Sequence, residues 1–312
     1  MYFFKTNKFA ETFFLAKEER INMDLVPFDK RNGKIWLNGQ MINWSDAKIH
    51  ILSHGLHYAS CVFEGERVYN GEIFKLREHT DRLFYSAETL GFKIPFSKDE
   101  IDKVCKEIIS IQKVKNGYVR PVAWRGSEMM AISAQQTKIH VAVAAWEWGT
   151  YFASDIKSKG IKLDISKWRR PHPSMAPCKT KAAGLYMICT LSKHEAELKG
   201  FHDSLMLDHA GNVAEATGAN IFFVKGKELH TPTPDSFLDG ITRRTIIDIA
   251  KRKNLNISER TIKVEELKDF EGCFLTGTAA EVTPVSQINN YQFKVMDLIK
   301  DLSTAYQNLV KK

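Results

Sequence analysis

The sequence predicts a mixed α/β chain of the α+β class that is organised in two domains. With 312 residues and 44% hydrophobic content, the chain is long enough for two ordinary domains, each with its own core. Short apolar runs that end at Asn-Gly predict strands, and segments with helical spacing of apolar residues predict helices. The two kinds of segment do not alternate strictly, which favours the α+β class. We expect a small domain over residues 31–147, a connector over 148–156 and a larger domain over 157–312.

Residues 1–30 are expected to form an extension outside the fold. The first 22 residues mix aromatic with charged side chains and contain no uninterrupted apolar stretch and no small-residue cleavage site, which argues against a secretory signal. Glu11, Glu18 and Glu19 argue against an organelle-targeting helix, because such helices avoid acidic residues. Met23 is an alternative start.

The smaller domain is expected to open with a hairpin over residues 34–44, because Asn38-Gly39 is a favoured two-residue turn between apolar flanks. Ser97 and Glu100 have the spacing of a capping box, so a helix is expected to start there. The other expected elements are a strand over 46–52, two strands over 61–76 joined at Asn70-Gly71, a helix over 78–90, and strands over 117–126 and 138–146.

In the larger domain, strands and helices are expected to follow one another without strict alternation. The expected elements are a strand over 160–166, a helix over 183–198, a strand pair over 204–208 and 220–224, a helix that begins near Ile241, a strand over 273–277 and an amphipathic helix over 295–310.

Charge and cysteine content exclude several classes of protein. The formal net charge is +8, but the basic residues are spread along the chain without a nucleic-acid motif, so we expect small anionic ligands and no nucleic acid. No run of 18 apolar residues occurs, so no membrane span is expected. The five cysteines are odd in number and lack CxxC spacing, which favours a reducing compartment and a cytoplasmic location.

Two lysines, Lys179 and Lys181, lie in the segment APCKTKAAGLYM, which is otherwise mostly small and apolar. A desolvated lysine can lose its charge, attack carbonyls and form a Schiff base, for example with pyridoxal phosphate. The alternative is that both lysines are solvated, which is the usual state of a lysine.

Three other segments favour the first interpretation. A helix is expected to start at GITRRT, residues 240–245, and the free N–H groups of a helix start attract phosphate. The segment LTGTAAEVTPV, residues 275–285, is a small, hydroxyl-rich turn. Glu215 is a single acid in an otherwise neutral stretch, and a protonated pyridine nitrogen would be a suitable partner for it.

These segments, together with SHGLHYASCVFEGER, REHTDRL, GYVRP and LDGITRR, occur in the order typical of one family. From about Lys34 to the C-terminus, the chain resembles the branched-chain amino-acid aminotransferases, class IV enzymes of pyridoxal-phosphate fold type IV with a D-amino-acid-aminotransferase-like fold. The resemblance implies reversible transfer of the amino group of L-leucine, L-isoleucine or L-valine to 2-oxoglutarate through a Schiff base with pyridoxal 5'-phosphate. It also implies a homo-oligomer, either a dimer or a hexamer.

The resemblance implies eight cofactor-binding residues. Lys181 matches the catalytic Schiff-base lysine, Tyr186 the tyrosine on the ring hydroxyl, and Glu215 the acid on the pyridine nitrogen. The others are Leu238, which packs on the ring, and four residues that hold the phosphate: Arg82, Ile241, Thr242 and Thr278.

The resemblance also implies where the substrate lies. Tyr118 and the backbone amides of Thr278 and Ala279 would hold the α-carboxylate, and Arg120 would meet the second carboxylate of glutamate. The remaining substrate residues would be Tyr58, Phe63 and Tyr151, which line the side-chain pocket, and Arg67.

The chain departs from the family pattern at two places. It has Ala183-Gly184-Leu185 where bacterial members often carry Gly-Gly-Asn, and Ala219 where the family has an acid. Both changes leave the cofactor residues intact and bear on substrate preference. A D-amino-acid aminotransferase and an aminodeoxychorismate lyase share the cofactor residues and are the alternatives, but SHGLHYASCVFEGER and GYVRP favour the branched-chain type.

Three histidines, His50, His54 and His57, have spacings that suggest a metal site. No acid or cysteine completes a ligand set, and helical spacing has no meaning in a strand-to-loop segment. We therefore predict no metal, and structural hydrogen bonds for these side chains.

Overall fold

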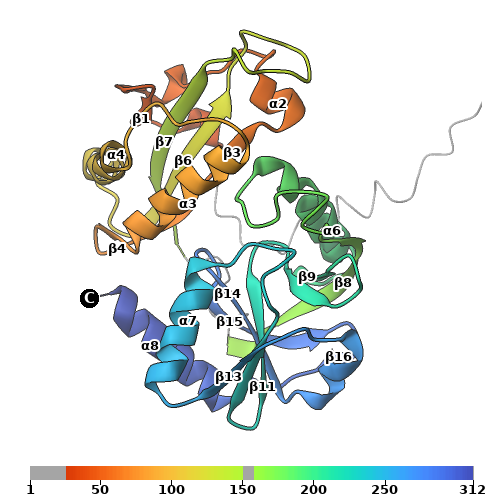
Figure 1. The fold of residues 1–312 in the computed structure, drawn as a ribbon. Helices are drawn as coiled ribbons and strands as arrows, with labels where there is room; N and C mark the ends of the chain where they lie inside the picture. The colour runs from red at the N-terminus through yellow and green to blue at the C-terminus, as the bar shows by residue number, and fades with distance from the viewer. Residues whose placement is uncertain (1–25, 150–157, 312) are drawn as a thin grey trace, which may run out of the picture.

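The strands divide into two sheets that follow one another along the chain (Figure 1). The computed structural model describes residues 26–149 and 158–311. The first sheet draws its strands from residues 34–147 and the second from 161–292. Helices and strands are mixed as expected, so the predicted α+β class is confirmed. Most of the expected extension and connector lie outside the described residues, and the exact domain boundaries stay a prediction.

The first sheet has seven strands in the order β2-β1-β7-β6-β4-β5, with β3 paired to β6. Its strands are β1 (Lys34–Leu37), β2 (Gln40–Asn43), β3 (Cys61–Phe63), β4 (Glu66–Tyr69), β5 (Glu72–Ile73), β6 (Gly117–Arg125) and β7 (Ile139–Glu147). The predicted hairpins at Asn38-Gly39 and Asn70-Gly71 are confirmed as β1–β2 and β4–β5. All four turn residues have positive φ, which the tight primed turns require.

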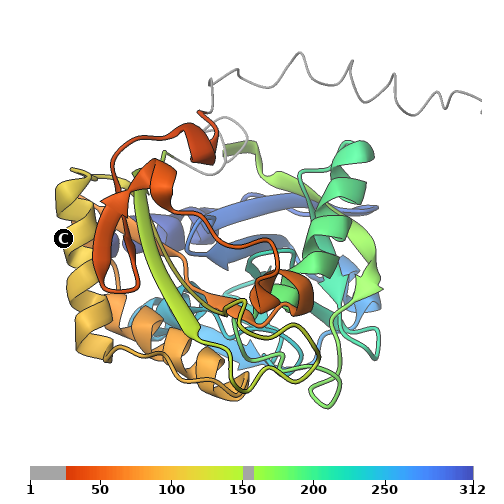
Figure 2. The same cartoon turned by 90° about the horizontal axis from the view of Figure 1, so that it is seen from above.

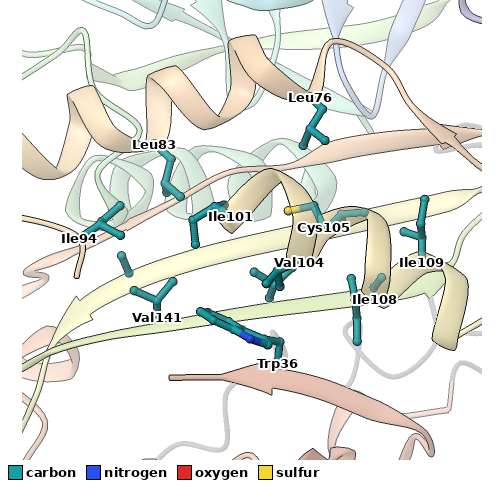
Figure 3. Close-up of a cluster of buried hydrophobic side chains, with 14 of the residues drawn as sticks. Trp36, Leu76, Leu83, Ile94, Ile101, Val104, Cys105, Ile108, Ile109 and Val141 are labelled. Atoms are coloured by element: carbon teal, nitrogen blue, oxygen red, sulfur yellow. The ribbon is translucent and has the colours of Figure 1, made fainter. Parts of the chain in front are cut away.

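Two helices, α3 (Leu76–Thr89) and α4 (Lys98–Ile111), pack against this sheet. Figure 3 shows Leu83 of α3 and Ile101 and Cys105 of α4 directed toward the strands, and all three are fully buried. The predicted capping box is confirmed, because the Ser97 hydroxyl accepts from the Glu100 N–H while the Glu100 carboxylate accepts from the Ser97 N–H. A short helix, α2 (His54–Tyr58), precedes β3.

The second sheet has nine strands in the order β10-β9-β8-β15-β14-β11-β12-β13, with β16 paired to β15. They are β8 (Ile161–Arg169), β9 (Asp203–Leu207), β10 (Val213–Ala216), β11 (Asn220–Lys225), β12 (Glu228–Thr231), β13 (Asn256–Glu259), β14 (Gly272–Gly277), β15 (Glu281–Ile288) and β16 (Tyr291–Gln292). Helix α6 (Met187–Leu198) packs on β8 and β9, while α7 (Ile241–Arg252) and α8 (Asp297–Val310) pack on β14 and β15. Seen from above, α4 and α6 lie at opposite sides of the molecule (Figure 2).

The strand predicted over residues 46–52 is wrong. This segment begins in the short 3-10 helix η2 (Trp44–Asp46) and continues as irregular backbone. Its residues alternate as a strand would, but no neighbouring strand pairs with it, and Ile51 is 69% exposed. The alternating apolar residues of this segment therefore belong to a surface that is exposed in the single chain.

Two further predictions need correction. The segments 204–208 and 220–224 do not form a pair, because β8, β15 and β14 lie between β9 and β11 in the sheet. The connection through α6 makes β9 parallel to β8, so β9 lies toward one edge and pairs there with β10. The first strand predicted within 61–76 is divided into β3 and β4 at Glu64-Gly65. Among the described residues, no helix is long and apolar enough to cross a membrane.

Candidate active site

One cavity is lined by residues from both parts of the chain. It contains Arg82 from α3, and its other lining residues come from positions 170–278. All eight residues predicted to bind the cofactor line this cavity: Arg82, Lys181, Tyr186, Glu215, Leu238, Ile241, Thr242 and Thr278. The fold therefore gathers side chains that lie up to almost 200 positions apart in the sequence.

The amine of Lys181 donates a hydrogen bond to the Tyr186 hydroxyl, with 2.9 Å between Nζ and the oxygen. The short 3-10 helix η3 (Ala183–Tyr186) turns the chain so that these residues, five positions apart, meet. The Lys181 backbone N–H donates to Ser86 Oγ at 3.0 Å, and its carbonyl accepts from the Phe63 N–H at 3.2 Å. The lysine is thus fixed on both α3 and β3. Lys179 is different, because its side chain is 60% exposed and lies 3.9 Å from Asp235.

Glu215 is a buried acid on β10 with two protein partners. Its Oε1 lies 3.3 Å from Arg170 Nε, and its Oε2 accepts from Asn220 Nδ2 at 3.2 Å. Burial raises the pKa of the Glu215 carboxyl to about 7, although Arg170 and Lys181 act in the opposite direction. The carboxyl is therefore poised between its two protonation states near neutral pH, and a nearby cation would favour its charged form.

Arg170 and Asn220 are site residues that the sequence predictions missed. Arg170 also donates to the carbonyl of Leu185 and contacts Cys189 Sγ, both at 3.3 Å. Asn220 donates to the carbonyl of Leu238 and accepts from the Gly240 N–H, so it fixes the loop that enters α7. Arg170 lies four positions beyond the strand predicted over 160–166 and a few residues before the lysine segment, but the pattern alone named no partner for this charged residue.

The cavity lining also contains several hydrogen-bond donors. The N-cap of α7, Gly240, has no side-chain capping bond, so the first-turn N–H groups of Ile241 and Thr242 are available. Arg82 and Thr278 line the same cavity. Thr276 also lines it, and its buried hydroxyl has no hydrogen-bond partner among the described residues. This arrangement suits an anionic group.

Three residues predicted for the substrate lie together beside the lysine. The ring of Phe63 is 4.9 Å from that of Tyr186, measured between centroids. The Arg120 guanidinium carbon lies 4.8 Å from the centre of the Phe63 ring and 5.4 Å from that of Tyr118. The buried Nε of Arg120 has no partner among the described residues. Position 65 must be glycine, because a Cβ there would lie 1.8 Å from the Tyr118 hydroxyl.

Of the described residues predicted for the substrate, Thr278 lines the cavity, whereas Phe63, Tyr118, Arg120, Tyr58 and Arg67 are outside its lining. Tyr58 is 43% exposed and stacks on His54 at 4.6 Å. Arg67 donates from Nη1 to the carbonyls of Trp148 and Gly149, at 3.2 and 2.9 Å. Ala279 is outside the cavity lining, and Tyr151 lies outside the described residues.

The three histidines considered for a metal each contact backbone. His54 Nε2 lies 2.9 Å from the Ala131 carbonyl, His57 Nε2 lies 2.9 Å from the Ile51 carbonyl, and His50 Nδ1 accepts from the Leu52 N–H at 3.1 Å. In the part of the chain that the structure describes, no group of three or more His, Cys, Asp or Glu residues is arranged to hold a metal. All five cysteines are free thiols.

Comparison with known proteins identifies the family. The model of the amino-transferase class IV family matches residues 61–288. The chain belongs to this family. Class IV aminotransferases use pyridoxal 5'-phosphate, which makes this chain a pyridoxal-phosphate transaminase and confirms the predicted cofactor.

Several relatives of this class IV aminotransferase are similar over most of their length. A probable branched-chain-amino-acid aminotransferase of Rickettsia conorii is 44% identical over 267 residues, which cover 86% of this chain and 91% of the relative. The solved branched-chain amino acid aminotransferase of Escherichia coli superposes with a TM-score of 0.87 at 34% identity, covering 90% of this chain and 95% of that one. The branched-chain enzyme of T.th., solved with N-(5'-phosphopyridoxyl)-L-glutamate, gives 0.86 at 35% identity with the same coverage.

The residues of the aminotransferase cavity fit this cofactor. A buried carboxyl at Glu215 suits a pyridine nitrogen, and the Lys181 amine suits an aldehyde. The unpartnered Thr276 hydroxyl and the uncapped start of α7 suit a phosphate.

Proposed function

We propose that this class IV aminotransferase moves the amino group of L-leucine, L-isoleucine or L-valine reversibly to 2-oxoglutarate. The observation that carries the proposal is the contact between Lys181 Nζ and the Tyr186 hydroxyl in the cavity that also contains Glu215. The printed names of the relatives support the branched-chain substrates, and the glutamate adduct of the T.th. enzyme supports 2-oxoglutarate as the acceptor.

Each cofactor residue has a specific task in this proposal. When bound, the cofactor supplies an aldehyde that takes up the amino group and a ring that accepts electrons. Lys181 would anchor it through its amine, and Tyr186, which accepts a hydrogen bond from that amine, would also meet the ring hydroxyl. Glu215, paired with Arg170, would hold the proton on the ring nitrogen. Arg82, Thr278 and the N-terminus of α7 would bind the phosphate, and Leu238 would pack on the ring.

Lys181 also moves the proton. Lys181 Nζ would take the α-proton of the bound amino acid as a general base and would then give up that proton as a general acid. A positioned acid–base group of this kind contributes about 10²–10⁴-fold to the rate. The Tyr186 hydroxyl, 2.9 Å away, would orient the amine for both transfers.

The substrate is proposed to lie between Phe63, Tyr118 and Arg120. An aliphatic side chain packs on the Phe63 ring, while the side-chain carboxylate of glutamate pairs with the unpartnered N–H of Arg120. The Tyr118 hydroxyl and the amides of Thr278 and Ala279 hold the α-carboxylate. Arg67 fixes the start of the connector that carries Tyr151.

The chain is proposed to act as a homo-oligomer in the cytoplasm. Large apolar side chains are exposed in the segment 49–58 and on α6, among them Ile51, Leu56 and Met187. Exposed apolar side chains in such numbers are typical of a protein interface, and a second copy would also cover Tyr58. Sedimentation of the purified chain tests this part, and a monomer would contradict it.

A coupled assay with 2-oxoglutarate tests the reaction. We expect turnover of L-leucine, L-isoleucine and L-valine, and none of D-alanine or D-leucine. Turnover of D-amino acids, or release of pyruvate from an aminated chorismate, would assign the chain to one of the two alternative activities of the same fold.

A further inference from the structure

Glu64 is a fully buried carboxylate beside the cofactor residues. It lies between β3 and β4, and its side chain is 0% exposed. Its Oε1 accepts from Arg82 Nε at 2.6 Å, and its Oε2 accepts from Arg82 Nη2 at 2.8 Å and from His79 Nδ1 at 2.6 Å. Neither Glu64 nor His79 lines the cavity, so neither belongs to the cofactor residues described above.

The contact between Glu64 and Arg82 is bidentate. Two parallel N–H···O bonds fix the plane of a guanidinium as well as its position. Arg82 uses Nε and one N–H of Nη2 for Glu64, and its Nη1 makes no hydrogen bond to the described residues. Because Arg82 also lines the cavity with Ile241 and Thr242, this pairing leaves the Nη1 edge for a ligand.

His79 holds the carboxylate from the other side. It lies one helical turn before Arg82 on α3, and its side chain is 1% exposed. Burial alone would raise the pKa of the Glu64 carboxyl, but Arg82 and His79 outweigh burial and hold this pKa well below its usual range. These contacts favour the charged form of Glu64, and the Gly65 N–H also donates to its Oε2 at 3.3 Å.

We propose that Glu64 is a positioning residue that orients Arg82 for the phosphate of the cofactor. Glu64 touches neither the cofactor nor the substrate and acts only through the guanidinium of Arg82. The inference rests on the proposed arrangement of the cofactor in the cavity.

The test compares pyridoxal 5'-phosphate with pyridoxal, which lacks the phosphate. The full chain is freed of cofactor and titrated with each compound, and binding is followed by quenching of tryptophan fluorescence. We expect Glu64→Gln to weaken binding of pyridoxal 5'-phosphate by about 10- to 100-fold, the range typical for loss of a residue that orients a ligand-binding group. Binding of pyridoxal is expected to stay unchanged. Equal weakening of both compounds, or of neither, overturns the proposal.

Two controls sharpen the result. Glu88→Gln makes the same change of charge on an exposed position of α3 and is expected to alter neither affinity. In an Arg82→Met background, Glu64→Gln is expected to have no further effect on pyridoxal 5'-phosphate, and a full additional loss would contradict the proposed role.

A second variant covers the case in which Glu64→Gln does not fold. Glu64→Asp keeps the charge but shortens its reach, and a smaller loss confined to the phosphate-bearing compound is expected. An unchanged ratio of the two affinities overturns the proposal. If the wild-type chain bound both compounds equally, the cofactor arrangement itself would fail, and the role of Glu64 with it.

Discussion

Arg170 Nε lies 3.3 Å from Glu215 Oε1, and both side chains are almost completely buried. Burying a carboxylate without a nearby cation costs free energy of folding. Arg170 reduces this cost for Glu215, an acid that the proposed chemistry requires. The pair connects the end of β8 to β10, and both residues line the cavity.

Glu215→Gln should change how stability depends on pH. The pKa of Glu215 is raised to about 7 in the fold, so its neutral form stabilises the protein below the unfolded pKa, and this contribution is lost as the pH rises through about 7. At about 1.4 kcal/mol per pKa unit, the cofactor-free variant should gain up to about 3 kcal/mol over the wild type between pH 5 and pH 8. Urea unfolding at both pH values measures this gain, and parallel curves would contradict it. Added cofactor should reduce the gain, because the ring nitrogen pairs with the wild-type carboxylate.

Lys181→Ala should abolish transamination. The variant loses the anchoring amine and the proton carrier together, so the rate should fall by at least about 10²-fold. The visible absorbance of the lysine-bound cofactor should also disappear. Lys179→Ala is the matched control, because Lys179 lies two residues away but is exposed, and it should keep both signals. Activity in Lys181→Ala close to that of the wild type would remove Lys181 from the mechanism.

Arg120→Met should separate the two substrates. Its unpartnered Nε is suited to the side-chain carboxylate of glutamate, whereas leucine needs only the apolar face of Phe63. The loss in kcat/KM should therefore be at least about tenfold larger for glutamate than for leucine, since a hydrogen bond to a charged group contributes about 1.5–3 kcal/mol. Steady-state kinetics with both amino acids provide the ratio, and equal losses would argue for a purely structural role.

Ser97→Ala should affect stability and leave activity intact. The variant removes the hydroxyl of the capping box at the start of α4, a helix that contributes no residue to the cavity lining. Loss of such a cap costs about 0.5–2 kcal/mol. Thermal unfolding should show a lower midpoint, while kcat and KM should be unchanged. A change in kcat would indicate that the start of α4 affects the geometry of the site.

Sequence patterns predicted correctly those elements that are determined by residues close together in the chain. The Asn-Gly hairpins, the capping box at Ser97 and the helix that begins at Ile241 all depend on residues within a few positions of each other. The segment 46–52 failed because alternation indicates only which side chains are apolar. Whether a partner strand is present depends on distant parts of the chain.

The sequence by itself determined the fold class, the family and eight of the residues that line the cavity, because the chain carries the motifs of one family in their usual order. Only the tertiary structure revealed the partners of those residues. Arg170 and Asn220 meet Glu215, Glu64 pairs with Arg82, and His79 in turn contacts Glu64. A buried charge must have a partner, but the partner's identity depends on which strands and helices pack together, and this is decided by the whole chain.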